Sequence, residues 1–188
     1  METPLSGPTP ERVLESRRLY EGRVVNLRVD TVELSGGRRA TREVVEHSQV
    51  VAIVPLVQGE EVLLVRQYRL PAGQTLLEVP AGGVDEGETA EQAALRELAE
   101  ECGQRAGNLE RLGGFYVSPG YCNEYIHLFL ATGLESVEAR PDPDEDLTVV
   151  RMSLAEALGL TRNGDIRDGK SIIALVWAWA KVHNFTIE

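Results

Sequence analysis

The chain has 188 residues, which is enough for one domain with a substantial core or for a domain with a small extension. Lys and Arg number 19 against 30 Asp and Glu, and the resulting formal net charge of −11 disfavours nucleic acid and anionic membranes as partners. The two cysteines imply no disulfide framework, so a reducing cytoplasm is the expected location.

The N-terminal third of the chain is rich in strand-like segments. Residues 1–12 lack the basic and apolar regions of a signal peptide and contain several prolines, so we expect a flexible tail there. A small antiparallel sheet is expected over 13–47, with strands at 13–20, 24–34 and 40–47 and a Ser-Gly-Gly turn at 35–37. Further strands are expected at 50–57, 61–67, 76–79, 109–116, 124–131 and 147–152.

Three helices are expected among and after these later strands. The first lies between Thr89, which forms a capping box with Gln92, and Gly103, the residue that ends it. Two more are expected, one beginning at Ser153 and one over 172–182, a segment whose apolar run is too short to span a bilayer. Antiparallel strands with helices packed on them predict an α+β or mixed α/β sandwich.

Acidic residues cluster on the first helix. At about 100° of rotation per residue, Glu97 and Glu101 lie about 40° apart and Glu100 lies about 60° from Glu97. A solvated acidic surface is the plain alternative. Glu97 and Glu101, however, project between Ala94 and its apolar neighbours on one side and Ala93 on the other, along the edge of the apolar seam. Like charges four residues apart destabilise a helix unless a cation lies among them. Oxygen ligands suit Mg²⁺, or Mn²⁺ as a substitute, and nothing here suits zinc.

The segment 82–104 resembles the Nudix hydrolase signature: a Gly, five residues, a Glu, seven residues, then R-E-U-x-E-E-x-G-U, where U is aliphatic. Gln104 departs from the aliphatic residue that the family prefers at the last position, where the side chain packs and binds no metal. The positions that match are Gly82, Glu88, Arg96, Glu97, Leu98, Glu100, Glu101 and Gly103.

This resemblance implies a Nudix-type α/β/α sandwich with a mixed sheet, and hydrolysis of a nucleoside diphosphate linked to another group. Arg96 would orient a glutamate, while the backbone amides of Gly82 and Gly83 would approach phosphate oxygens. Two or three Mg²⁺ ions would be held by the Ala81 carbonyl and by three glutamates of the helix, Glu97, Glu100 and Glu101.

Two features outside the signature indicate the substrate class. V-R-Q-Y-R places Arg66 and Arg69 at the end of a strand before the glycine turn, where structural salt bridges are the alternative reading. The segment resembles the one with which ADP-ribose diphosphohydrolases bind the diphosphate and the terminal ribose, with Arg69 the stronger candidate. Pro119 lies 15 residues beyond Gln104; it is an ordinary turn residue by itself, but its offset resembles the ADP-ribose pyrophosphatase subgroup.

The segments 42–47 and 166–175 also resemble that subgroup, so the resemblance covers nearly the whole chain. It implies that Arg42 contacts the adenine or the diphosphate. Glu78 is expected either to contact the ligand or to hold Arg69.

An acidic segment, P-D-P-D-E-D at 141–146, is expected to form a loop before the strand at 147–152. A solvated connection is the alternative. The resemblance implies that a glutamate of this loop is the base for the attacking water, which makes Glu145 the candidate ahead of Asp144 and Asp146. A mobile loop would bring the base to the site only with substrate bound.

The expected reaction is hydrolysis of ADP-ribose to AMP and ribose 5-phosphate. If the chain is an enzyme, two alternative substrates remain open: a sugar nucleotide such as GDP-mannose, and an oxidised nucleoside triphosphate. Outside it, the domain could sense ADP-ribose without hydrolysing it, although the intact set of glutamates favours an enzyme.

The expected domain organisation is a sheet region at 13–47 followed by a Nudix domain at 48–188. A sheet of that size cannot bury its own apolar face. The resemblance implies a homodimer in which this region reaches the neighbouring subunit, and folding back on its own domain is the alternative.

Overall fold

The computed structural model describes residues 10–58, 60–139 and 146–185, which form two compact units. One unit contains Met1–Ser48 together with Tyr116–Glu124. The other contains Gln49–Phe115 and Tyr125–Glu188. The first unit is therefore discontinuous in sequence, whereas a single boundary between residues 47 and 48 was predicted.

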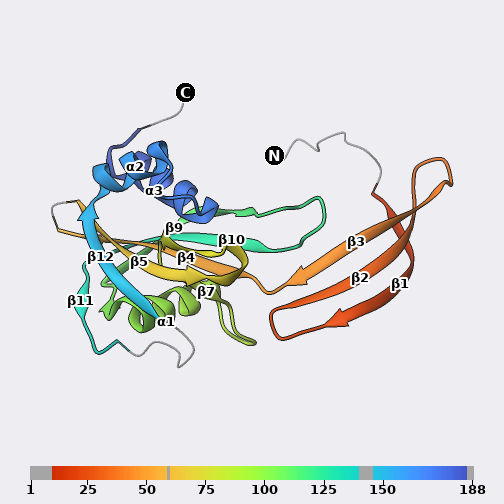
Figure 1. Ribbon diagram of the computed structural model, residues 1–188, viewed down its shortest axis with the longest axis horizontal. Coiled ribbons are helices and arrows are strands. Elements are labelled where there is room, and N and C mark those ends of the chain that lie inside the picture. Colours follow the sequence, from red (N-terminus) through yellow and green to blue (C-terminus); the bar gives the residue numbers. More distant parts are fainter. Residues whose placement is uncertain (1–9, 59, 140–145, 186–188) are drawn as a thin grey trace. The chain divides into compact units, whose positions relative to one another are not determined.

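The first unit is built on an antiparallel sheet, which confirms the small sheet expected from the sequence (Figure 1). Gly36 and Gly37, with φ of +85° and +78°, form the turn before its last strand, a backbone conformation that glycine adopts without strain. The strands in order are β1 (Arg12–Glu21), β2 (Val25–Glu33) and β3 (Arg39–His47).

The segment Tyr116–Glu124 joins this unit through the backbone of β3. The amide of Val45 donates to the carbonyl of Tyr121 at 2.8 Å, and the amide of Asn123 donates to the carbonyl of Val45 at 3.2 Å. The side-chain oxygen of Asn123 also accepts a hydrogen bond of 2.8 Å from the amide of His47.

The second unit is built on a seven-stranded mixed sheet of order β12-β5-β4-β10-β9, with β6 beside β5 and β7 beside β4. β4 pairs parallel with β10 and antiparallel with β5 and β7. The strands are β4 (Val50–Val57), β5 (Glu61–Arg69), β6 (Gln74–Glu78), β7 (Ala81–Gly83), β9 (Asn108–Tyr116), β10 (Tyr125–Thr132) and β12 (Leu147–Ser153).

Helices cover both faces of this sheet, α1 on one face and α2 and α3 on the other (Figure 1). Along the central strand β4, Val51 and Ile53 pack in the cluster of α1, whereas Ala52 and Val54 pack in that of α2 and α3. Burial on both faces explains why this strand is an unbroken apolar run, and the α/β/α sandwich is confirmed. The helices are α1 (Ala90–Cys102), α2 (Leu154–Asn163) and α3 (Gly169–Val182).

The predicted helix caps are confirmed. Thr89 Oγ1 accepts from the amide of Gln92 at 3.2 Å, and Gln92 Oε1 accepts from the amide of Thr89 at 2.8 Å. Gly103 ends α1 with φ of +59°. Ser153 caps α2 through its side chain, as expected. Asp168, which was not among the predicted caps, caps α3, and this helix begins at Gly169, three residues before its predicted start.

Some short elements were not predicted. The glycine segment after β6, expected to be a turn, is paired as β7 with β4. Two-residue strands β8 (Gln104–Arg105) and β11 (Glu135–Ser136) form a separate pair, and η1 (Leu70–Ala72) is a 3₁₀ turn. In the described part of the chain no helix is both long and apolar enough to cross a membrane.

Candidate active site

Arg96 on α1 lies at the centre of a carboxylate cluster. Its guanidinium donates to both oxygens of Glu88 at 3.1 and 2.9 Å, to Glu97 Oε1 at 2.6 Å and to Glu100 Oε2 at 3.0 Å. It also donates to the carbonyl oxygen of Gly83 at 2.8 Å. Arg96 therefore connects three glutamates to the backbone at the end of β7.

These hydrogen bonds stabilise the charged forms of the partners. The pKa of Arg96 lies above its ordinary value, chiefly because of the hydrogen bonds to Glu88 and despite partial burial. The pKa of Glu88 lies below its ordinary value because Arg96 donates to it. Both groups therefore carry charge at neutral pH.

Glu97 and Glu101 are buried between α1 and β7, with 8% and 2% of their surfaces exposed. Glu101 Oε2 accepts a hydrogen bond of 3.0 Å from the amide of Ala81. A Cβ on Gly82 would lie 2.0 Å from Glu97 Oε1, so only glycine allows the carboxylate to approach the strand so closely. The glycine of the sequence motif thus makes room for the Glu97 side chain.

The atoms available to bind a metal ion at this site are all oxygens. They belong to the carboxylates of α1 and to the backbone of β7. Hard oxygen donors fit Mg²⁺ or Mn²⁺, and one arginine cannot neutralise the several glutamates gathered there. Among the residues that the structure describes, no three acidic, His or Cys side chains already converge in metal-binding geometry. Glu97 and Glu100 instead each use one oxygen to accept from Arg96.

Arg69, at the end of β5, forms a bidentate ion pair with Glu78 of β6. Arg69 Nε donates to Oε1 and Nη2 donates to Oε2, both at 2.9 Å. Burial raises the pKa of Glu78, but the hydrogen bonds from Arg69 and the charge of Lys170 outweigh burial and leave the pKa below its ordinary value. The pKa of Arg69 is raised, chiefly by the hydrogen bonds to Glu78 and in part by the charge of Glu101 on α1.

Arg66 is exposed on β5. Arg66 and Arg69 are three positions apart on one strand, so their side chains leave opposite faces of the sheet. The structure therefore does not bring the two arginines of V-R-Q-Y-R together.

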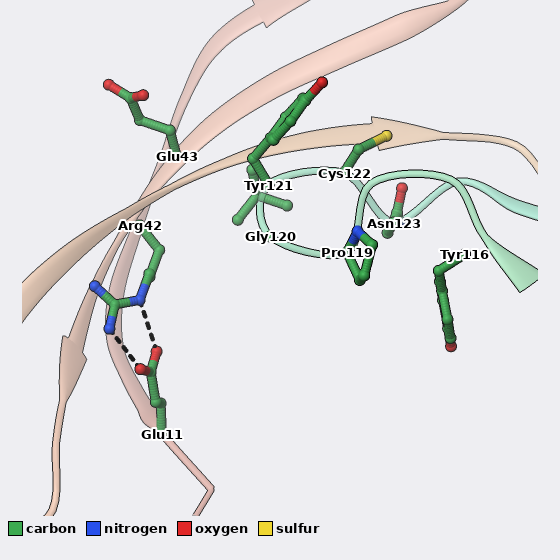
Figure 2. Close-up of a pocket in the computed structure, with 10 residues that line it drawn as sticks. Glu11, Arg42, Glu43, Tyr116, Pro119, Gly120, Tyr121, Cys122 and Asn123 are labelled. Carbon is green, nitrogen blue, oxygen red and sulfur yellow. Dashed lines mark hydrogen bonds and ion pairs between the residues drawn. The ribbon is translucent and has the colours of Figure 1, made fainter. Parts of the chain in front are cut away.

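Arg42 and Pro119 both line a cavity of about 440 Å³ within the first unit (Figure 2). Figure 2 shows Arg42 turned toward Glu11, to which it donates at 3.0 and 2.5 Å. Tyr116 and Tyr121 contribute exposed rings to the same cavity. A cavity with aromatic side chains and one arginine can hold a flat, partly polar ring system.

The acidic loop is only partly described. Glu145 and Asp144 lie outside the described residues. Asp146 is exposed and directly precedes β12.

Sequence reasoning missed Lys170, whose ammonium group lies 2.5 Å from Glu78 Oε2 and 2.9 Å from Asp168 Oδ2. The available signal was Glu78 itself, since a glutamate in a strand that leads into the core needs cationic partners. Lys170 lies 92 positions from Glu78 in the sequence, so the sequence did not indicate that this lysine pairs with Glu78.

Two family profiles match the chain. The NUDIX domain matches residues 46–175, and the nucleoside diphosphate sugar hydrolase N-terminal domain matches residues 11–45. The second match covers most of the three-stranded sheet, and the first covers α1 and the carboxylate cluster.

Relatives share most of the chain. An ADP-ribose pyrophosphatase of Bacillus subtilis (strain 168) is 35% identical over 173 residues, which cover 91% of this chain and 94% of the relative. A methanol dehydrogenase activator of Bacillus methanolicus is 38% identical over 167 residues, 88% of this chain and 90% of the relative. The crystal structure of an ADP compounds hydrolase superposes with a TM-score of 0.84 at 26% identity, over 96% of this chain and all of that one.

Proposed function

Because this chain belongs to the Nudix hydrolase family, we propose that it hydrolyses the diphosphate bond of ADP-ribose to give AMP and ribose 5-phosphate. The carboxylate cluster of α1 against the backbone of β7 carries this proposal. It supplies buried carboxylate oxygens beside the backbone of β7, and such oxygen ligands are what a metal-bound diphosphate requires. The ADP-ribose pyrophosphatase and the ADP compounds hydrolase among the similar proteins support this choice of substrate.

The metal would be held by Glu97, Glu100, Glu101 and the Ala81 carbonyl. Bound Mg²⁺ would screen the charge of the diphosphate, lower the pKa of a water molecule and stabilise the leaving oxygen. Mn²⁺, which also prefers oxygen ligands, would substitute for it.

The protein's own groups position the diphosphate and move the proton. Arg96 orients Glu97 and Glu100, and the backbone amides of Gly82 and Gly83 approach phosphate oxygens. Arg69, held by Glu78, pairs with the diphosphate or the terminal ribose, and Arg66 is a weaker candidate for the same role. Glu145 accepts the proton of the attacking water.

Arg42 and Pro119 serve the adenosine end of the substrate. The cavity that they line in the first unit supports this role, since its tyrosines offer faces on which an adenine can stack. In this proposal the protein is a cytoplasmic homodimer, and the sheet of one copy helps to close the adenosine pocket of the other.

A second candidate substrate is a sugar nucleotide such as GDP-mannose. The match of residues 11–45 to the nucleoside diphosphate sugar hydrolase N-terminal domain favours it. Both substrates have a diphosphate between a nucleoside and a sugar, so the metal site would act on both in the same way.

The test is an assay of the purified chain with Mg²⁺ and a panel of nucleoside diphosphate derivatives, with products separated by chromatography. We expect AMP and ribose 5-phosphate from ADP-ribose, faster than products from GDP-mannose, and no turnover with excess EDTA. Binding of ADP-ribose without turnover at saturating Mg²⁺ would instead identify a sensing module. Faster turnover of GDP-mannose would reassign the substrate.

A further inference from the structure

A network of charged side chains with little exposure to water links the first turn of α3 to the end of β6. Lys170 Nζ donates to Glu78 Oε2 at 2.5 Å and to Asp168 Oδ2 at 2.9 Å. The side chain of Lys170 is 13% exposed and that of Glu78 is 1% exposed. Charges so little exposed to water need direct partners, and Lys170 supplies one to each of these carboxylates.

Ser171 completes a closed ring of hydrogen bonds, because it connects Asp168 back to the residue that follows Glu78. Ser171 Oγ donates to Asp168 Oδ2 at 2.5 Å and accepts from the amide of Val79 at 2.8 Å. Val79 directly follows Glu78, so the side chain of one residue and the backbone of the next are both fixed to the start of α3. Ala81 and Gly82 of the carboxylate cluster lie just beyond this fixed point.

Glu78 connects the ring to Arg69. Both oxygens of Glu78 accept from the guanidinium of Arg69, which fixes the plane of that group as well as its position. Glu78 Oε2 also accepts from Lys170, so the two cations share one oxygen. Any rotation of the Glu78 carboxylate would therefore move the Arg69 guanidinium.

We propose that Lys170 is a positioning residue: by holding the Glu78 carboxylate between itself and Arg69, it sets the orientation in which Arg69 binds the diphosphate end of the substrate. This inference rests on the proposed function for the ligand of Arg69. Without the ammonium group, the carboxylates of Glu78 and Asp168 would lose the cation that they share, and the repulsion between them would displace Glu78. The alternative is that Lys170 only fastens α3 to the sheet.

Activity tests separate these two roles. In Lys170→Met, which keeps the apolar stem, we expect KM for ADP-ribose to rise about tenfold while kcat changes by less than about threefold, because a misplaced binding group weakens substrate binding. In Arg69→Lys, which lacks the guanidinium fork, adding Lys170→Met should raise KM no further. The matched control is Lys181→Met on the same helix, where the ion pair with Glu110 is half exposed, and its KM should equal that of the wild type.

A second readout needs no turnover. The Nε–H signal of Arg69 in a ¹H–¹⁵N spectrum, assigned by its loss in Arg69→Lys, should shift or broaden in Lys170→Met and stay in place in Lys181→Met. If Lys170→Met does not fold, Asp168→Asn takes its place, since asparagine caps a helix as well as aspartate does but does not pair electrostatically with Lys170.

The outcomes are distinct. An unchanged Arg69 signal, or KM effects that multiply in the double variant, would overturn the positioning role even if the melting temperature falls. If the wild type hydrolyses no nucleoside diphosphate compound, the proposed function fails, while the Arg69 signal still decides whether Lys170 positions that side chain.

Discussion

Glu101 is held by its surroundings before any ligand arrives. It is 2% exposed, and its Oε2 accepts from the amide of Ala81. Substitution by glutamine keeps this hydrogen bond but removes the charge that a cation needs. We therefore expect Glu101→Gln to lower kcat by about 10²-fold or more with the fold intact, the scale seen when one electrostatic stabiliser is lost.

The measurement is turnover at saturating Mg²⁺ together with a circular dichroism melt. Glu91→Gln, on the exposed side of α1, is the matched control and should keep wild-type turnover. Near wild-type turnover in Glu101→Gln would remove Glu101 from the site.

Gly82 is required by a close approach rather than by its backbone angles. A Cβ there would lie 2.0 Å from Glu97 Oε1, so Gly82→Ala must displace the carboxylate. We expect this variant to lose most of its activity and to bind Mn²⁺ more weakly. Mn²⁺ binding is measured by electron paramagnetic resonance. Gly159→Ala in α2, where a Cβ meets nothing within 4 Å, should leave both unchanged and stabilise the helix by up to about 1 kcal/mol. Equal Mn²⁺ affinity in Gly82→Ala and the wild type would contradict this account.

The base is assigned by resemblance to a residue outside the described part of the chain. Glu145→Gln should lower kcat by roughly 10²-fold or more with little change in KM, the usual scale of general-base catalysis. Asp144→Asn should matter less. If both substitutions have the same effect, or if Asp146→Asn alone is damaging, the base is a different residue of this loop.

Much of the carboxylate cluster could be predicted from sequence because its members are close in the chain and helix geometry fixes their directions. Glu97, Glu100 and Glu101 share a helix face at any overall fold. The pairing of Glu78 with Lys170 could not be predicted, since it depends on how α3 meets β6. The side chains of Arg66 and Arg69 point to opposite faces of the sheet because side chains alternate along a strand. This could have been predicted from the sequence.

At the scale of elements, α1 depends on its capping box to present the glutamates. Thr89→Ala removes the acceptor for the amide of Gln92 and should lower the free energy of unfolding by about 1 kcal/mol, measured by urea denaturation. Thr89→Ser keeps the hydroxyl and should stay within a few tenths of a kcal/mol of the wild type. Equal losses in both variants would indicate that packing of the threonine methyl group, and not the cap, stabilises this end.

Element boundaries followed local signals where these existed. Thr89, Gly103 and Ser153 marked helix ends because capping is a local interaction. β7 had no such signal, because the segment Ala81–Gly83 pairs with β4 through its backbone and shows no apolar alternation. The attachment of Tyr116–Glu124 to β3 is likewise made chiefly by backbone groups, and one sequence does not reveal such a pairing.

At the scale of the whole molecule, the three-stranded sheet leaves apolar side chains in water. Val13 and Tyr20 on β1 are 54% and 58% exposed, and Val24, in the connection before β2, is 59% exposed, although Val32 on β2 is 3% exposed and buried. A sheet of three strands with such a surface has little stability by itself. A second copy of the chain would cover these side chains, which is why we propose the homodimer.

Removal of residues 1–45 tests the homodimer. The truncated chain lacks β1, β2 and most of β3, so we expect a weakened or aggregating protein with poor affinity for ADP-ribose. Light scattering on the full chain should report near twice the chain mass of 20.7 kDa. Arg42→Ala in the full chain is the finer probe, because it should weaken ADP-ribose binding while the dimer mass stays the same. A full-length protein that stays monomeric at micromolar concentration and still hydrolyses ADP-ribose well would refute a pocket shared between two copies.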